Sequence, residues 1–99
     1  MISRTYKKMA TRILPVGAES TLAAGSGNAT TVGGATVVRV LATSGSVVVF
    51  RTDEDDVAIG SFTMMNNTAE LVEKYHSDKI YVTGAAVKIA SVGNHPVKY

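Results

Sequence analysis

The sequence predicts an all-β protein, a single antiparallel β-sandwich or small barrel with an extended N-terminal arm. Short runs rich in β-branched residues recur along the chain, and turn-forming Gly and Asn residues separate them. A chain of 99 residues makes one domain that can bury one small core. We place the arm, or a first strand, at residues 1–16 and the β-sandwich domain at residues 17–99.

The N-terminal arm is basic and allows two conformations. Four cations and no acid occur in its first twelve residues: Arg4, Lys7, Lys8 and Arg12. A helix would place Tyr6, Met9 and Ile13 on one face and would end at Pro15. Strand alternation also works from Met9 onward. We favour an extended arm or first strand because the rest of the chain has strand character.

The next part of the chain is poor in charge. Between Ile13 and Phe50 the only charged residues are Glu19 and Arg39. Because a solvated surface normally carries more charge, this stretch is buried, lies at an assembly interface, or both. Within it, Glu19–Gly34 has no clear period and holds four of the nine glycines. Its composition fits a flexible loop and equally an extended segment that lies on a neighbouring subunit.

Two strand pairs flank short glycine-containing turns and predict hairpins. The first pair is Ala35–Ala42 and Ser46–Phe50, and the second is Asp78–Thr83 and Ala86–Val92. The two turns resemble each other, which fits a weak internal repeat or the ordinary chemistry of hairpins.

Three further strands complete the prediction. Val57–Met64 and Ala69–Tyr75 are joined by Asn66-Asn67, and residues 95–99 form a last edge strand. Pro96 is compatible with that strand only at an edge, because proline cannot donate a ladder hydrogen bond.

The strand around Arg39 is apolar on both faces. Val38 and Val40 lie on one face, and Val37 and Leu41 lie on the other. Strands of this kind are covered on both sides, and in a small sandwich the second cover can be a neighbouring subunit. We therefore expect partner binding through two apolar residues and the basic arm: Val37, Leu41, Arg4, Lys7, Lys8 and Arg12.

No pattern in the sequence indicates catalysis. The acids Asp53–Asp56 lack the spacing of a calcium loop, so we expect the solvated tip of a hairpin. His76 and His95 are far apart, and there is no cysteine for a zinc site. Gly25-Ser26-Gly27 lacks the Lys-Ser/Thr that follows in a phosphate-binding loop. We expect a protein that is not an enzyme, with no catalytic residues, no cofactor and no metal.

The composition also limits which classes of macromolecule the protein is expected to bind. No apolar stretch approaches the roughly 18 residues that span a membrane. The four cations of the arm lack the interleaved aromatic residues of many nucleic-acid-binding segments. We therefore expect no membrane and no nucleic acid as partner, and an acidic protein surface fits the arm better.

The chain resembles the small all-β structural virion proteins of tailed bacteriophages. The resemblance covers Val38–Gly93 and rests on a Val-x-Ala-Thr-Ser-Gly turn at residues 40–45, a Glu-Leu-Val strand at 70–72 and an Ile-x-Val-Thr-Gly turn at 80–84. It also extends to the uncharged front half, which is rich in Ser, Thr, Gly and Ala. Proteins of this kind are not enzymes, so no catalytic residue carries over.

The resemblance implies a non-enzymatic structural role in a bacteriophage, foremost as a capsid decoration or stabilising protein. It implies a multi-copy assembly or homo-oligomer, bound to the major capsid protein or to tail proteins. The expected location is the virion, assembled in the bacterial host cytoplasm. The alternatives are a tail or adaptor ring component and a small carbohydrate-binding host-attachment module. Against the last stand the absence of Trp and the scattered positions of the tyrosines.

Overall fold

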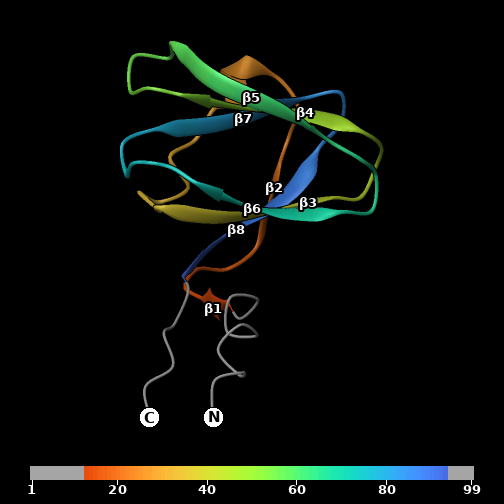
Figure 1. The fold of residues 1–99 in the computed structure, drawn as a ribbon, viewed down its shortest axis with the longest axis horizontal. Helices are drawn as coiled ribbons and strands as arrows, with labels where there is room; N and C mark the ends of the chain where they lie inside the picture. Colours follow the sequence, from red (N-terminus) through yellow and green to blue (C-terminus); the bar gives the residue numbers. More distant parts are fainter. Residues whose placement is uncertain (1–12, 94–99) are drawn as a thin grey trace, which may run out of the picture.

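The protein is all-β, and its strands form two antiparallel sheets that face each other (Figure 1). The computed structural model describes residues 13–93. In the first sheet β8 lies beside β3, β3 lies beside β6, and β1 and β2 both pair with the other edge of β8. The second sheet has the order β5-β4-β7. The strands are β1 (Leu14–Pro15), β2 (Ser20–Leu22), β3 (Val37–Ala42), β4 (Val47–Thr52), β5 (Ala58–Met64), β6 (Ala69–Glu73), β7 (Lys79–Thr83) and β8 (Val87–Gly93).

The two predicted hairpins are wrong. Strands β3 and β4 lie in different sheets, and so do β7 and β8, so each turn carries the chain from one sheet to the other. The turn between β5 and β6 crosses in the same way. We call such a connection an arch. A glycine-containing turn between two β-branched strands is compatible with an arch and with a hairpin, so the local sequence does not distinguish the two connections.

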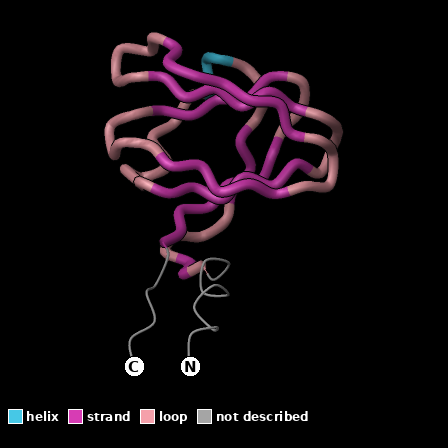
Figure 2. Tube along the Cα trace, viewed as in Figure 1, coloured by secondary structure: helices cyan, strands magenta, loops and turns pink. Residues whose placement is uncertain are grey.

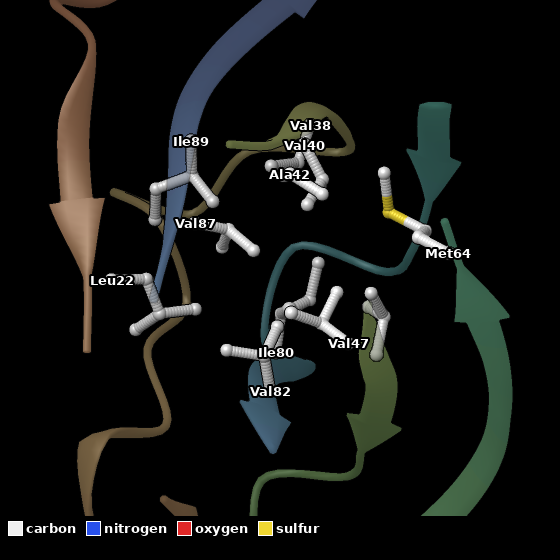
Figure 3. Close-up of a cluster of buried hydrophobic side chains, with 11 residues drawn as sticks. Leu22, Val38, Val40, Ala42, Val47, Met64, Ile80, Val82, Val87 and Ile89 are labelled. Atoms are coloured by element: carbon white, nitrogen blue, oxygen red, sulfur yellow. The ribbon is translucent and has the colours of Figure 1, made fainter. Parts of the chain in front are cut away.

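The core is built almost entirely from two arches packed side by side (Figure 3). Strand β3 pairs with β8 and β4 pairs with β7, so the two arches run antiparallel to each other. Nine of the eleven clustered core residues belong to these four strands; only Leu22 and Met64 come from elsewhere. The nine are Val38, Val40, Ala42, Val47, Val49, Ile80, Val82, Val87 and Ile89.

The segment Glu19–Gly34 is not a free loop, because it is hydrogen-bonded to both sheets of its own chain. It forms β2 on the first sheet, crosses to the second sheet, and passes through a short 3-10 helix, η2 (Ser26–Asn28) (Figure 2). The N–H of Gly25 donates to the carbonyl of Val82 at 2.8 Å, and Thr30 exchanges two backbone hydrogen bonds with Ile80. The segment therefore covers the edge of β7 and closes one side of the molecule.

The described part of the predicted arm pairs with the end of the first sheet. Leu14 lies opposite Gly93 and Pro15 lies opposite Val92. The choice between helix and strand for the rest of the arm, and the predicted edge strand at 95–99, fall outside the described residues. Across residues 13–93 there is no helix with the length and apolar character needed to cross a membrane.

Candidate interaction surfaces

The acid run forms the tip of the β4–β5 hairpin, where the sequence placed it. Asp53 Oδ1 accepts hydrogen bonds from the N–H groups of Asp55 (2.8 Å) and Val57 (3.0 Å). Asp56 has a left-handed backbone (φ 67°), and its carboxylate lies 2.9 Å from Lys79 Nζ. Asp53 therefore shapes the turn, while Glu54 and Asp55 are exposed to solvent.

No metal-binding group is assembled in the described part of the chain. Within residues 13–93, no three acidic, His or Cys side chains gather closely enough to hold an ion. His76 is exposed in the turn after β6, and His95 lies outside the described residues.

A charged cluster occupies one end of the space between the sheets. Asp78 is almost fully buried (4% exposed), and its Oδ2 accepts a hydrogen bond from Arg51 Nη1 at 2.6 Å. The same oxygen accepts the N–H of Tyr75 at 3.1 Å. Lys74, 6% exposed, donates from Nζ to the carbonyl of Tyr75 at 3.3 Å. Arg51 therefore neutralises the buried carboxylate while the hydrogen bonds fix the turn after β6.

The pKa values of Asp78 and Lys74 are both lowered, and in each case burial and neighbouring charge act in opposite directions. Burial alone would raise the pKa of Asp78, but the hydrogen bonds from Arg51 and Tyr75 and the charges of Arg51 and Lys74 hold it below its ordinary value. Burial lowers the pKa of Lys74, and the charge of Asp78 opposes part of that shift. The lowered pKa keeps the Asp78 carboxylate charged at neutral pH, as its ion pair requires.

A shallow hollow of about 370 Å³ lies beside this cluster. Its lining is mixed in charge: Thr36, Val37, Arg51, Glu73, Lys74 and Tyr75. The guanidinium carbon of Arg51 lies 5.9 Å from the ring centre of Tyr75, which is 74% exposed. Arg51, one of the lining residues, is engaged by Asp78 through the 2.6 Å hydrogen bond.

The outer face of the first sheet carries an apolar strip: Val37, Leu41, Ala69 and Leu71. Cross-strand pairing places these side chains on one face of β3 and β6, because Leu41 lies opposite Ala69 and Arg39 lies opposite Leu71. Leu71 is 41% exposed. A second shallow hollow, of about 220 Å³, lies over the same strands and is lined by Ile13, Arg39, Ala69, Glu70 and Leu71.

Two cations on this outer face have partners at or next to β2. Arg39 lies 3.8 Å from Glu19, and Lys88 Nζ donates to Thr21 Oγ1 at 2.8 Å. Both partners belong to β2 or to the residue before it, on the far side of β8. The strip is not free of charge, because Arg39 lies between Val37 and Leu41 on the same face and the exposed Glu73 lies opposite Val37.

The second sheet presents a stacked aromatic pair on its outer face. Phe50 and Tyr81 are cross-strand neighbours whose ring centres lie 4.6 Å apart at an angle of 6°. Each ring thus covers one face of the other. A sugar-binding aromatic residue stacks through an open ring face. Because the two rings stack on each other, we interpret this pair as a packing contact.

The predicted partner-binding residues divide into two groups. Val37 and Leu41 both face outward on β3 and are half-buried by their neighbours. Arg4, Lys7, Lys8 and Arg12 lie outside the described residues. Sequence reasoning missed Ala69 and Leu71, which the pairing of β6 with β3 adds to the strip. The outward alternation of Leu71 in Ala69–Glu73 was the available signal.

Comparison of the chain with models of protein families, with curated proteins and with solved structures finds no match in any of the three.

Proposed function

We propose that the protein is a non-enzymatic structural component of a bacteriophage virion, most specifically a capsid decoration or stabilising protein. In this proposal, residues 17–99 form a single sandwich domain that docks on the capsid, and residues 1–16 act as a basic arm. Many copies would bind one particle, on the major capsid protein. The resemblance of Val38–Gly93 to small virion proteins is the reason for proposing a role in a virion.

The apolar strip is the observation that carries the proposal. Interface cores are depleted in charged residues, and here the two cations of the face are tied to Glu19 and Thr21 at its other side. Leu71 and Ala69 are exposed beside Val37 and Leu41, so a partner would find four apolar side chains on one face, with Arg39 among them and Glu73 at one end. The arm adds four cations, which suit an acidic partner and make encounter sensitive to salt.

The experiment is binding to phage particles that lack the protein. Leu71→Lys is the test variant, because Leu71 is exposed and its replacement leaves the core intact. We expect it to reduce particle binding at least tenfold, as a charge at an interface centre is costly. Thr83→Lys, on the outer face of the second sheet, is the matched control and should bind as the unmodified protein does. Equal binding by both variants would contradict docking through the apolar strip.

The arm is tested separately. Replacing Lys7 and Lys8 by Gln should slow association and weaken its dependence on salt, since screened charges act mainly on encounter. Unchanged kinetics at low and high salt would remove the arm from the docking surface and leave the strip in place.

A tail or adaptor ring component is the second structural candidate, and it uses the same apolar strip toward a different virion protein. Labelled protein seen at the tail rather than over the capsid would select it. The carbohydrate-binding alternative is favoured by a single feature, the exposed Tyr75 ring beside a polar hollow. A glycan-array signal that Tyr75→Ala abolishes, together with no particle binding, would replace the structural proposal.

A further inference from the structure

The edge of β5 differs from the other sheet edges among residues 13–93. Gly25 and Thr30 cover the edge of β7, and β6 carries Glu70 and Glu73 at its edge. Strands β1 and β2 are only two and three residues long. Strand β5 has seven residues, of which none is charged and none is proline, and six are exposed. Natural sheets normally protect such an edge by charge, proline, a bulge or a cover.

Part of this edge is irregular, which limits where another strand can pair. Arg51 lies opposite Gly60 and Thr52 lies opposite Ala58, so Ile59 is the extra residue of a β-bulge. Gly60–Met64 remains a regular stretch of antiparallel strand paired only with β4. Alternate backbone N–H and C=O groups of that stretch point away from β4 and have no strand partner within the described residues.

Phe62 marks the same edge with an incompletely covered aromatic ring. It lies opposite Val49, a core residue, so its side chain is on the inner face of the second sheet. Nevertheless it is 38% exposed, because among residues 13–93 no strand lies beyond β5. A hollow of about 140 Å³ separates it from Val72 and Glu73 of β6.

We propose that β5 of one copy pairs antiparallel with β5 of a second copy about a two-fold axis, so that the two three-stranded sheets join into one. The axis passes through Phe62, the centre of Gly60–Met64. Phe62 then lies opposite Phe62 of the second copy on the inner face, and Ser61 lies opposite Thr63 on the outer face. Aromatic pairs and hydroxyl pairs are both favourable cross-strand neighbours.

Charge identifies a second copy of β5, rather than of β6, as the occupant. Self-pairing of β5 brings no like charges together, because Ala58–Met64 is uncharged. Self-pairing of β6 would bring Glu70 and Glu73 of both copies to one interface, which is unfavourable. The β5 register also directs Ile59, 49% exposed, toward Met65 of the second copy, 64% exposed. The dimer therefore covers the apolar side chains that flank the edge.

This surface is separate from the apolar strip and does not depend on the proposed function. The strip lies on the outer face of the first sheet, whereas β5 is an edge of the second (Figure 1). A dimer through β5 leaves the strip of both copies open for docking.

Disulfide trapping tests the register. The chain has no cysteine, so one introduced thiol reports one position. Under mild oxidation Phe62→Cys should form a covalent dimer, since the two thiols face each other across the axis. Leu71→Cys is the control: Leu71 is equally exposed (41% against 38% for Phe62) but lies on the first sheet. Equal trapping at both positions, or none at position 62, would overturn the register.

Sedimentation velocity of the full chain tests the dimer without removing the ring. We expect a concentration-dependent dimer that Thr63→Lys weakens about tenfold or more, because two lysines enter the interface. Thr83→Lys is the matched control, since Thr63 and Thr83 both lie opposite Val48, on the two sides of β4. Circular dichroism confirms that both variants fold.

Two results would overturn the dimer. One is a Thr63→Lys variant that dimerises as strongly as the unmodified chain. The other is a monomer whose amides in Gly60–Met64 all resist hydrogen exchange, because the edge would then be covered by residues of its own chain. Particle binding by Thr63→Lys separates the proposals: a monomer that still binds through the strip leaves the proposed function standing.

Discussion

Gly84 lies where the two arches meet. Its backbone has φ 104°, and a Cβ placed on it would come within 2.8 Å of the carbonyl oxygen of Ser46 in the neighbouring turn. Both the dihedral angle and the close approach exclude a side chain. We predict that Gly84→Ala lowers the free energy of unfolding by roughly 2–3 kcal/mol, measured by urea denaturation.

Gly27 provides the control for this substitution. It has no positive φ, and a Cβ there would meet no atom within 4 Å. Gly27→Ala should leave the unfolding free energy within about 0.5 kcal/mol of the unmodified value. Equal losses at the two positions would mean that the close contact between the turns does not limit stability.

The four hairpin acids have unequal roles. Asp53 accepts two backbone hydrogen bonds that shape the turn, whereas the Glu54 side chain makes no hydrogen bond within residues 13–93. Asp53→Ala should lower the unfolding free energy by about 1 kcal/mol, and Glu54→Ala should change it by less than about 0.5 kcal/mol. Urea denaturation of both variants at neutral pH makes the measurement. If the two variants are equally stable, the turn does not depend on the Asp53 side chain.

The lowered pKa of Asp78 predicts acid sensitivity. Because the folded-state pKa lies below the ordinary value of about 3.9, the unfolded chain binds more protons between the two values. The stabilisation is therefore complete above the ordinary pKa and is lost as pH falls through the folded-state pKa. Asp78→Asn should remove this contribution, so that its melting temperature falls less than that of the unmodified protein between pH 5 and roughly pH 2.

A pair of substitutions identifies the cation that matters. Arg51→Met leaves Asp78 buried without its 2.6 Å partner and should be markedly less stable at pH 7. Lys74→Met removes a buried cation whose one hydrogen bond within residues 13–93 is a long one to a carbonyl (3.3 Å), so it should be far less damaging. If Lys74→Met melts at a lower temperature than Arg51→Met, then Lys74, and not Arg51, is the main partner of the Asp78 carboxylate.

At the scale of elements, strand positions could be predicted from the sequence but their partners could not. The β-branched run at residues 35–42 located β3, but the sequence showed it apolar on both faces and did not tell that the face of Val38 and Val40 is the buried one. Whether the chain turns back within a sheet or crosses to the other sheet depends on long-range packing, here of Ala42 and Val47 on opposite sides of one core. Only the β4–β5 turn, with its acid tip, was both located and paired correctly.

The candidate surfaces show the same division. Val37 and Leu41 could be predicted because their outward alternation is local to β3. Leu71 joins them through a pairing with Arg39 across a separation of 32 residues, which no local pattern encodes. The role of Glu19–Gly34 as a cover for β7 also depends on contacts distant in sequence, the hydrogen bonds to Ile80 and Val82.

At the scale of the whole molecule, the two sides between the sheets are unlike. One side is closed by the segment that leaves β2 and passes along β7 (Figure 2). The other side ends in the edges of β5 and β6, which pair with no further strand in the described part of the chain. The two proposals place protein contacts on two distinct surfaces of this molecule, the edge of β5 and the apolar strip.

Copy number in purified phage particles tests the proposed structural role most directly. Quantitative mass spectrometry of gradient-purified particles, calibrated with isotope-labelled protein, measures the number of molecules per particle. A capsid decoration protein should be present in a fixed, high ratio to the major capsid protein, and should be lost together with capsids rather than with detached tails. Absence of the protein from purified particles, or a ratio that varies from one preparation to the next, would contradict the account.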